Sequence, residues 1–443
     1  MSALNTDLYE LTMAAGYFAA GKARDVATFE LMVRRLPDHR NFLVAAGLQQ
    51  AVEYLSDFRF HAEELEYLRS LKQFENTPAE FFDFLRDLRF TGDLFAMPEG
   101  TPFFPGEPMA IVRAPLIEAQ LVETYLLSTF SFQTSIATKA ARCVFAAEGR
   151  PIIEFGSRRA HSPEAGILAA RAAYIGGCEG TSNAEAGMRF GIPVSGTAAH
   201  SWTMAFEKEE ESFRALQNLL GEATVFLIDT YDTLEGARLA ARLGRPCLGV
   251  RLDSGELESL SRQVRAILDN AGLKDAKIMA TNDLDEHRIA QFVRAGAPID
   301  EFGVGTQLAT SADAPALAAV YKLVELQTAD SIHYTAKFSG EKSTVPAAKQ
   351  VYRSPDSDTV AIFNECNSDF TGEPLVRPVI SKGAMVEPLP TLTDSQKRAA
   401  SATAALPSEL HSIDKTALYP VEISPRLLQL GDQVRREHAV QIP

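Results

Sequence analysis

The sequence predicts an α/β protein that has a barrel of parallel strands and a second, smaller α+β domain. From about residue 152 the chain repeats a short apolar run, a loop with charged or small residues, and an amphipathic helix. The runs follow one another at intervals of about 20–30 residues, as βαβ units of a parallel sheet do. None carries the GxGxxG turn of an open dinucleotide-binding sheet, which favours a barrel.

Seven strands are expected in the barrel. Five apolar runs are clear, and they are residues 151–155, 225–229, 246–253, 276–283 and 301–306. Two shorter runs, around residues 175–178 and 192–196, are expected to be further strands. Several intervening helices close on glycine, which is typical of helix C-termini.

The chain before residue 150 has a different pattern. We expect a helix from near Thr6, a β-type run at 27–33, helical stretches within 42–88, Pro- and Gly-rich strands within 92–114, and a helix over 116–147. After about residue 329 come short β-type runs such as HYTAKFSG and KQVYR, expected to return to this N-terminal layer. The predicted domains are therefore 1–150, completed by about 330–443, and a barrel over 151–329. The polar, Ala/Ser-rich stretch 391–406 is expected to be an exposed connection.

Composition excludes some classes of protein. The 443 residues carry a formal net charge of -15, which argues against a general nucleic-acid or membrane-surface binder. The N-terminus does not have the pattern of a signal peptide, and no apolar run approaches the roughly 20 residues of a membrane helix. The four cysteines have no zinc-site spacing, so we expect reduced thiols, no metal site and a cytoplasmic protein.

Polar or glycine residues follow the strands at the positions where barrel enzymes place their chemistry. They are Asp229, Asp253, Asn282, Asp283, Gly303 and Gly305. Arg251 and Asp253 are two residues apart, so they share one face of their strand. A carboxylate here could bind sugar hydroxyls or a magnesium ion, or it could simply cap the next helix. Both roles stay open.

The segment FGVGT ends a strand at Thr306. Two glycines let the backbone approach a phosphate closely, and the N–H groups can then bind it. A tight turn between strand and helix explains the same residues equally well.

Aromatic, basic and imidazole side chains lie near two other strand ends. Phe155 and Arg158 could bind an anionic aromatic molecule by stacking and by a bidentate ion pair, although a buried ring and a solvated arginine are about as plausible. His200 could be a base, a metal ligand or a nucleophile. A single histidine is more often structural, and His161 and His287 share this ambiguity.

Together these segments resemble the nicotinate phosphoribosyltransferases. The matching segments run in order from Asn5 to Arg353: NTDLYELTM, ATKAAR, EFGSRRAHSPEAG, GTSNAEAG, GTAAHSW, IDTYDT, RLDSG, TNDLDE, FGVGTQLATS and KQVYR. Because they cover most of the chain, the resemblance is specific.

The resemblance implies an activity and an architecture. The family joins nicotinate to phosphoribosyl pyrophosphate, giving nicotinate mononucleotide and pyrophosphate with coupled ATP hydrolysis and magnesium. Its members have an irregular α/β barrel and a second domain built from the N-terminal part and C-terminal strands. They are typically homodimers with active sites at the subunit interface, so the implied partners are small molecules and a second copy of the chain.

The resemblance also implies roles for individual residues. His200 matches the histidine that ATP phosphorylates, and Phe155 would stack on the pyridine ring with Tyr9 of a neighbouring subunit opposite. Arg158 and Arg251 would contact the nicotinate carboxylate and the phosphoribosyl group, and Asp253 the ribose. The remaining implied site residues are Gly303, Gly305 and Thr306 for the 5′-phosphate, Asn282 and Asp283 in the pocket, and Lys139 and Arg142 for pyrophosphate.

Thr181 and Ser182 are expected to bind the substrate, and base selectivity is expected at Ser182, which follows the Gly180–Thr181 pair. Related nicotinamide enzymes carry an aspartate at that position, and an aspartate would repel the carboxylate of nicotinate. Competing interpretations are a nicotinamide or quinolinate transferase, a sugar-phosphate aldolase or isomerase with a Schiff-base lysine, and a non-catalytic scaffold.

Overall fold

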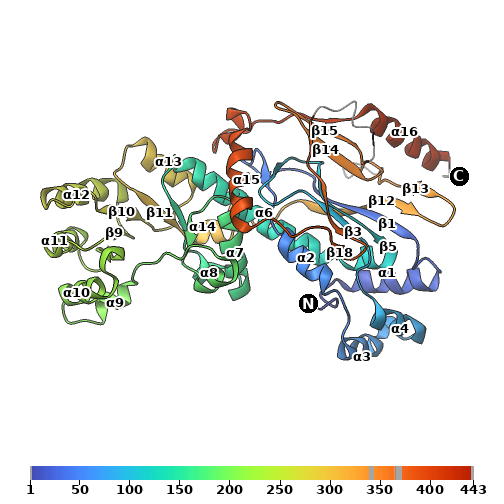
Figure 1. The fold of residues 1–443 in the computed structure, drawn as a ribbon, viewed down its shortest axis with the longest axis horizontal. Coiled ribbons are helices and arrows are strands. Elements are labelled where there is room, and N and C mark those ends of the chain that lie inside the picture. Colours follow the sequence, from blue (N-terminus) through green and yellow to red (C-terminus); the bar gives the residue numbers. More distant parts are fainter. Residues whose placement is uncertain (1, 339–343, 364, 366–371, 441–443) are drawn as a thin grey trace. The chain divides into compact units, whose positions relative to one another are not determined.

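The computed structural model describes residues 2–338, 344–363, 365 and 372–440 (Figure 1). The chain is a mixed α/β protein with two compact units. Unit 1 comprises Met1–Thr134 and Ala316–Pro443, and unit 2 comprises Ser135–Pro315. A compact unit is not by itself an independently folding domain, so the domain limits predicted at residues 150 and 329 stay predictions.

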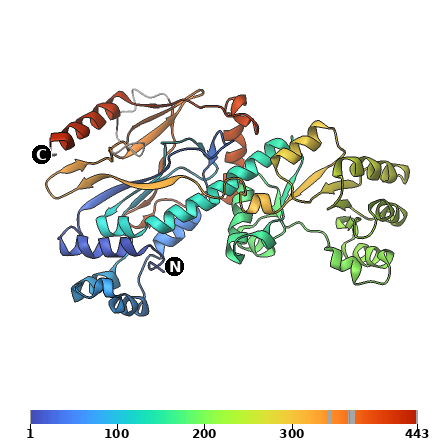
Figure 2. The same ribbon diagram turned by 180° about the vertical axis from the view of Figure 1, so that it is seen from behind.

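Unit 1 is built on an antiparallel sheet of order β13-β12-β1-β5-β3-β17-β18. A four-stranded sheet, β16-β14-β15-β19, and the pair β2-β4 accompany it. Helix α16 packs against β15, as Figure 2 shows from behind. The elements are α1 (Leu8–Ala19), β1 (Val26–Val33), β2 (Leu43–Val44), α2 (Leu48–Ser56), α3 (Ala62–Ser70), α4 (Ala79–Asp87), β3 (Asp93–Ala96), β4 (Pro102–Phe103), β5 (Pro108–Pro115), α5 (Leu116–Leu121), β12 (Ala319–Gln327), β13 (Ile332–Tyr334), β14 (Lys349–Arg353), β15 (Asp358–Ile362), β16 (Glu373–Pro374), β17 (Arg377–Ser381), β18 (Ala384–Met385), α15 (Leu392–Ala404), β19 (Val421–Ile423) and α16 (Pro425–Val440). Helix α6 (Glu123–Ala146) contains the boundary between the units.

Strands from both ends of the chain share the large sheet. β12 pairs antiparallel with β1 from Val26 opposite Gln327 to Val33 opposite Ala319. β17 pairs with β3 at the other side of the same sheet. Seven of the eight residues of β1 are buried, so its backbone N–H and C=O groups need partners, and β12 and β5 supply them on its two edges.

The expectation of an exposed connection over residues 391–406 is wrong, because most of the segment is helix α15. Thr391 accepts a hydrogen bond from the backbone N–H of Asp394, whose side chain in turn binds the Thr391 N–H, forming a capping box. Ser395 and Ala399 are buried, and Gly100 packs against their backbone so closely that an added Cβ would lie 2.2 Å from the Ser395 carbonyl oxygen. The small residues therefore serve packing.

Unit 2 contains a parallel sheet of order β7-β6-β11-β10-β9-β8. Its elements are β6 (Ile152–Glu154), α7 (Pro163–Ile175), β7 (Gly180–Thr181), α8 (Ala184–Phe190), α9 (His200–Met204), α10 (Glu209–Leu220), β8 (Val225–Leu227), α11 (Thr233–Leu243), β9 (Gly249–Leu252), α12 (Leu257–Asn270), β10 (Lys277–Ala280), α13 (Glu286–Arg294), β11 (Glu301–Val304) and α14 (Thr306–Ala309). All five clear runs of the sequence thus contain a strand.

The two shorter runs did not form strands as expected. Residue Ile175 ends helix α7, and the strand begins later, at Gly180. In the run 192–196 only Val194 pairs, through an isolated parallel bridge to Thr181. Short apolar runs do not distinguish a strand from the end of a buried helix, which explains the first error.

Two sequence expectations concern membranes and cysteines. No helix in the described ranges is long and apolar enough to cross a membrane. Cys143, Cys178 and Cys247 are buried and form no disulfide within the described residues, and Cys366 lies outside those residues.

A buried polar cluster joins the early and late segments of unit 1. Arg353 donates to both oxygens of Asp358, which is fully buried, and to the carbonyl of Pro102. Glu107 is also fully buried and accepts from the backbone N–H of Phe104 at 2.9 Å. Burial raises the pKa of Glu107 well above its ordinary value, and the charge of Asp358 and a hydrogen bond to it raise the pKa further.

We predict that Glu107 makes unit 1 less stable as pH rises. A carboxyl with a raised folded pKa contributes stability that is fully present below its unfolded pKa and is lost as pH rises toward the folded value. Glu107→Gln stays neutral, so it should match wild type near pH 5 and exceed it at pH 8 by about 1 kcal/mol or more, since each pKa unit is about 1.4 kcal/mol. Thermal melting at both pH values measures this. Glu75→Gln, at an exposed position of unit 1, is the control, and equal pH profiles for Glu107→Gln and wild type would contradict the prediction.

Candidate functional site

Two adjoining cavities lie at the strand ends of unit 2, and four residues line both. The first has a volume of about 180 Å³ and the second about 470 Å³. The shared residues are Phe155, Arg158, Arg251 and Asp253. The first cavity is also lined by Arg159, Thr281, Asn282, Asp283, Gly303, Gly305 and Thr306, and the second by Ser182, Gly196, Thr197, Ala198, Ala199, His200 and Leu227. Most residues singled out in the sequence thus converge.

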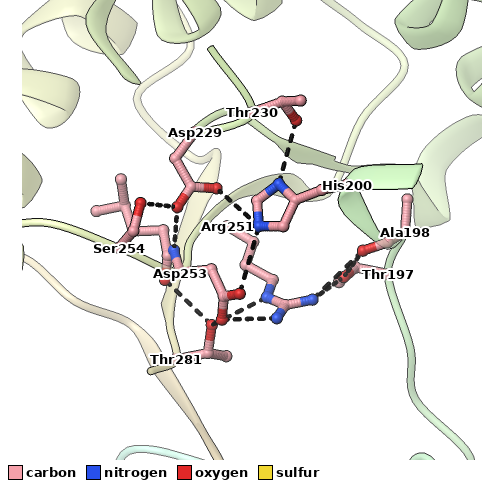
Figure 3. A network of polar contacts seen from close by, with 10 residues as sticks. Thr197, Ala198, His200, Asp229, Thr230, Arg251, Asp253, Ser254 and Thr281 are labelled. Atoms are coloured by element: carbon pink, nitrogen blue, oxygen red, sulfur yellow. Dashed lines mark hydrogen bonds and ion pairs between the residues drawn. The ribbon is translucent and has the colours of Figure 1, made fainter. Parts of the chain in front are cut away.

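Arg251 is the centre of the polar network between the cavities (Figure 3). Its Nη2 donates to Oδ1 of Asp253 at 2.7 Å, and its Nε donates to Oγ1 of Thr281 at 3.0 Å. Its Nη1 donates to Oγ1 of Thr197 at 2.9 Å. The expected shared face of Arg251 and Asp253 is confirmed, and the guanidinium is held by groups from three different segments.

Asp253 is held ionised by its neighbours. Burial by itself raises the pKa of this carboxyl, but the charge of Arg251, the hydrogen bonds from Thr281 and Arg251, and the charge of His200 together lower the pKa below its ordinary value. The side chain remains 26% exposed, so its free edge faces the cavities. The site therefore presents a fixed negative charge beside a fixed positive one.

His200 is the first residue of α9 and faces the second cavity. Its Nδ1 lies 3.3 Å from Oγ1 of Thr230, and its Nε2 lies 3.5 Å from Oδ2 of Asp253. The side chain is 40% exposed, so it is not a buried structural histidine. His161, by contrast, is exposed and lines neither cavity, and Ser162 next to it caps α7.

Asp229 is a carboxylate behind His200. Its Oδ2 accepts from the backbone N–H of Asp253 at 3.0 Å and from the Ser254 hydroxyl at 2.5 Å. Its Oδ1 lies 4.0 Å from Nε2 of His200 and has no hydrogen-bond partner within the described chain, although the side chain is fully buried. An unpartnered buried carboxylate oxygen is costly, and such groups occur where a ligand or a proton is handled.

The helix-cap alternative for the acids at the strand ends is wrong. Helix α11 begins after Asp232, whose side chain accepts from two backbone N–H groups, and α13 begins after Asp285. The residue before α12 is Glu256, which makes no side-chain cap. Asp229, Asp253, Asn282 and Asp283 are therefore not used as caps.

Backbone strain marks the loop after β10. Asn282 has a φ of 92° and Asp283 a φ of 46°, both in the left-handed region that non-glycine residues rarely adopt. Such conformations cost free energy and are concentrated at functional sites. Both residues line the first cavity.

The two glycines of FGVGT have different constraints. A Cβ on Gly303 would lie 2.5 Å from Cδ2 of Phe155 and 2.7 Å from Cγ2 of Thr281. Gly303 therefore lets the Phe155 ring lie directly on β11. A Cβ on Gly305 would meet only ordinary contacts, the nearest being 3.4 Å from the Phe155 carbonyl oxygen. Packing thus explains Gly303, and Gly305 remains free to line the cavity.

Three expected site residues do not line the cavities, and a fourth, Tyr9, was expected from a neighbouring subunit. Thr181 is buried, and its hydroxyl donates to Glu154 at 2.6 Å. Lys139 forms ion pairs with Glu286 and Asp313, and Arg142 donates to Glu286 at 2.8 Å. Tyr9 belongs to unit 1, where it is 48% exposed on α1.

Seven cavity residues were not selected from the sequence, and three of them have polar side chains. Arg159 neighbours Arg158, Thr281 precedes Asn282, and Thr197 lies in the GTAAHSW segment. Arg159 and Thr281 are adjacent to a selected residue and Thr197 is three positions before His200, so proximity to the selected residues was the available signal. No lysine lines either cavity among the described residues, which disfavours a Schiff-base aldolase.

Comparisons with known proteins agree over the length of the chain. Three family models match: the nicotinate phosphoribosyltransferase (NAPRTase) N-terminal domain at residues 4–131, the NAPRTase family at 151–351 and the NAPRTase C-terminal domain at 363–431. The chain is 44% identical to nicotinate phosphoribosyltransferase pncB2 of Mycobacterium tuberculosis, covering 99% of this chain and 95% of that one. It is 40% identical to the nicotinate phosphoribosyltransferase of Bacillus subtilis, covering 95% and 92%. The crystal structure of human nicotinic acid phosphoribosyltransferase superimposes with a TM-score of 0.83 at 29% identity, covering 97% and 99%.

We predict that Gly303→Ala is far more damaging than Gly166→Ala. The new methyl group at 303 must displace the Phe155 ring, and such overpacking costs about 1–3 kcal/mol of unfolding free energy. Gly166→Ala is the matched control, because Gly166 lies in helix α7 of the same unit and a Cβ there would meet only ordinary contacts, so it should lose no stability. Thermal melting of the two variants measures the difference. Equal losses would show that the contact of Phe155 with Gly303 does not constrain this position.

Proposed function

The chain belongs to the nicotinate phosphoribosyltransferase family, and on that premise we propose that the two adjoining cavities of unit 2 are its active site. The enzyme forms nicotinate mononucleotide and pyrophosphate from nicotinate and phosphoribosyl pyrophosphate, a step of NAD salvage. The observation that carries the proposal is that Phe155, Arg158, Arg251 and Asp253 line a cavity continuous with the one that contains His200.

Nicotinate binds beside Phe155 and Arg158 in this proposal. An aromatic face and a guanidinium fork suit a planar ring that carries a carboxylate. The Cζ of Arg251 lies 5.9 Å from the centre of the Phe155 ring, so positive charge is present on this side too. Gly305 and Thr306 receive the 5′-phosphate of the sugar through backbone N–H groups and a hydroxyl.

Asp253 stabilises the transition state. As pyrophosphate leaves, the ribose C1 acquires oxocarbenium character, and a carboxylate with a lowered pKa remains ionised to oppose that positive charge. The pyridine nitrogen is unprotonated at neutral pH, so the reaction needs no general base. Magnesium, when bound, neutralises the leaving pyrophosphate. Asp253, which faces the cavities, would supply a carboxylate to such an ion beside the oxygens of the substrate, whereas the side chain of Asp229 is fully buried.

His200 accepts the phosphoryl group of ATP in this scheme. Asp253 and Asp229 lie on the Nε2 side of the ring, so they favour the tautomer with its proton on Nε2. That tautomer leaves the lone pair of Nδ1, next to Thr230, as the nucleophile. The coupling of ATP hydrolysis to the reaction is part of the proposal.

The finer architecture also belongs to the proposal. The strand order β7-β6-β11-β10-β9-β8 is the cyclic order of a barrel interrupted between β7 and β8, and the Val194 bridge extends the β7 side. We propose an irregular barrel on this basis. We also propose a homodimer in which Tyr9 reaches the ring of nicotinate across the interface. Its exposure, and that of Leu8 and Met13 on the same helix, supports this. Lys139 and Arg142 as pyrophosphate ligands and a cytoplasmic location remain predictions.

We predict that ATP stimulates mononucleotide formation only when His200 is present. Purified protein is assayed with phosphoribosyl pyrophosphate, magnesium and nicotinate, nicotinamide or quinolinate, with and without ATP. Wild type should use nicotinate and gain rate from ATP, and His200→Ala should lose the gain and the acid-labile phosphate label from ATP. His161→Ala is the control and should keep both. Label retained in His200→Ala would refute the assignment, and turnover of quinolinate in place of nicotinate would refute the substrate.

We predict that Ser182→Asp selects against nicotinate. Ser182 lines the second cavity, and a carboxylate there would repel that of the substrate. The ratio kcat/KM for nicotinate should fall by at least about tenfold. Asparagine has the size of aspartate without its charge, so Ser182→Asn should lower kcat/KM for nicotinate much less. Full nicotinate activity in Ser182→Asp would show that Ser182 does not determine the selectivity for nicotinate.

A further inference from the structure

Glu154 is a fully buried carboxyl at the end of β6, directly beneath the candidate site. Its Oε2 accepts a hydrogen bond from the Thr181 hydroxyl at 2.6 Å, and its Oε1 accepts one from the backbone N–H of Gly156. Thr181 ends the neighbouring strand β7. One side chain therefore binds the loops that follow two adjacent strands.

The two loops are joined at further points. The Thr181 hydroxyl oxygen accepts from the backbone N–H of Asn183 at 3.0 Å, and the Asn183 amide donates to the Ser157 hydroxyl at 3.0 Å. The backbone N–H of Ser182 donates to the Glu154 carbonyl at 2.9 Å. These hydrogen bonds, together with the backbone between Glu154 and Ser157, thus form a closed ring.

The cavity residues of both loops alternate with the residues of this ring. Phe155 lies between Glu154 and Gly156, Arg158 follows Ser157, and Ser182 lies between Thr181 and Asn183. Phe155, Arg158 and Ser182 all line the second cavity. The ring itself is turned away from the cavities, since neither Glu154 nor Thr181 lines them.

We propose that Glu154 is a positioning residue that, through Thr181, sets the placement of Ser182 relative to Phe155 and Arg158 and so sets the preference for a carboxylate over an amide on the pyridine ring. This inference rests on the proposed active site. Nicotinate and nicotinamide differ in one small group, so a displacement of a few tenths of an ångström between the two loops changes the discrimination.

The local packing shows that keeping this contact restricts which residues can occupy positions 154 and 156. An apolar residue would be the cheaper choice at the end of a strand whose other residues, Ile152 and Ile153, are buried. Burial raises the pKa of Glu154, which hydrogen bonds from Thr181 and Gly156 partly offset. Gly156 must be glycine, because a Cβ there would lie 2.9 Å from Oε1 of Glu154 and 2.2 Å from Cβ of Ala309. The backbone is therefore shaped to bring a donor to this carboxyl.

The test compares Thr181→Val, which removes only the hydroxyl, with Thr181→Ser, which keeps it. With ATP and phosphoribosyl pyrophosphate saturating, Thr181→Val should raise the KM for nicotinate about tenfold, the effect of one buried hydrogen bond. The ratio of kcat/KM for nicotinate to that for nicotinamide should fall by a similar factor. The KM for phosphoribosyl pyrophosphate should change less than about twofold, because Arg251 lies on another strand, β9, and Asp253 directly follows that strand. Thr181→Ser should restore wild-type values.

A matched control is available at Thr224, which is also buried in unit 2. Its hydroxyl has no hydrogen-bond partner in the described structure, and it precedes β8 at the end of the sheet opposite to the cavities. Thr224→Val should leave both KM values unchanged. A loss of nicotinate affinity in Thr224→Val as large as that in Thr181→Val would mean a general packing effect and would overturn the proposal.

A double-mutant cycle tests whether Glu154 acts through Thr181. Glu154→Ala should raise the KM for nicotinate as Thr181→Val does, and the double variant should be no worse than either single variant. Additive effects, or an unchanged base preference in folded Thr181→Val, would overturn the proposal. If Glu154→Ala does not fold, the comparison of Thr181→Val with Thr181→Ser decides alone. Wild-type protein that is inactive on nicotinate would refute the active site itself, and this outcome is distinct from the others.

Discussion

The in-register parallel pairing of β6, β11, β10 and β9 is the constraint on which the rest of the site depends. Phe302 pairs with both Ile152 and Ala280, and Ala280 pairs in turn with Leu252. The residues that follow these positions therefore lie in one layer at one edge of the sheet. Residues up to 150 positions apart in the chain become neighbours only because the backbone hydrogen bonds fix this register.

Arg251 and Asp253 place a fixed pair of opposite charges in that layer. Arg251 donates hydrogen bonds to Asp253, Thr281 and Thr197, so the protein itself holds both the cation and the anion in place. The same carboxylate, Asp253, approaches His200, which links the chemistry of the first cavity to that of the second. In the proposed scheme, phosphorylation of His200 would change the charge beside Asp253 and so would alter the electrostatics at the proposed ribose position.

Buried ionic groups have a structural role in other parts of the molecule. Lys139 and Arg142 share Glu286, where burial raises the pKa of that carboxyl but the two cations lower it to a net value below the ordinary one. Glu286 begins α13, so this pairing fixes the start of the helix just after the strained Asn282 and Asp283. In unit 1, Lys349 and Glu30 are joined at 2.6 Å in the same way. Removing one partner of such a pair would leave the other charge buried without compensation, which is strongly destabilising.

The sequence by itself determined the positions of the parallel strands, the polar residues at their exits and the family, because strand and helix periodicity and short motifs are local properties. It left open whether the acids capped helices, and it missed α15, whose buried small residues resemble those of an exposed linker. Only the tertiary structure decided that Asp229 faces His200, that Gly303 accommodates a ring, and that Lys139 is paired with Glu286. These contacts join residues between 29 and 148 positions apart in the sequence. They depend on which strands pair with one another, and a local sequence pattern does not specify that pairing.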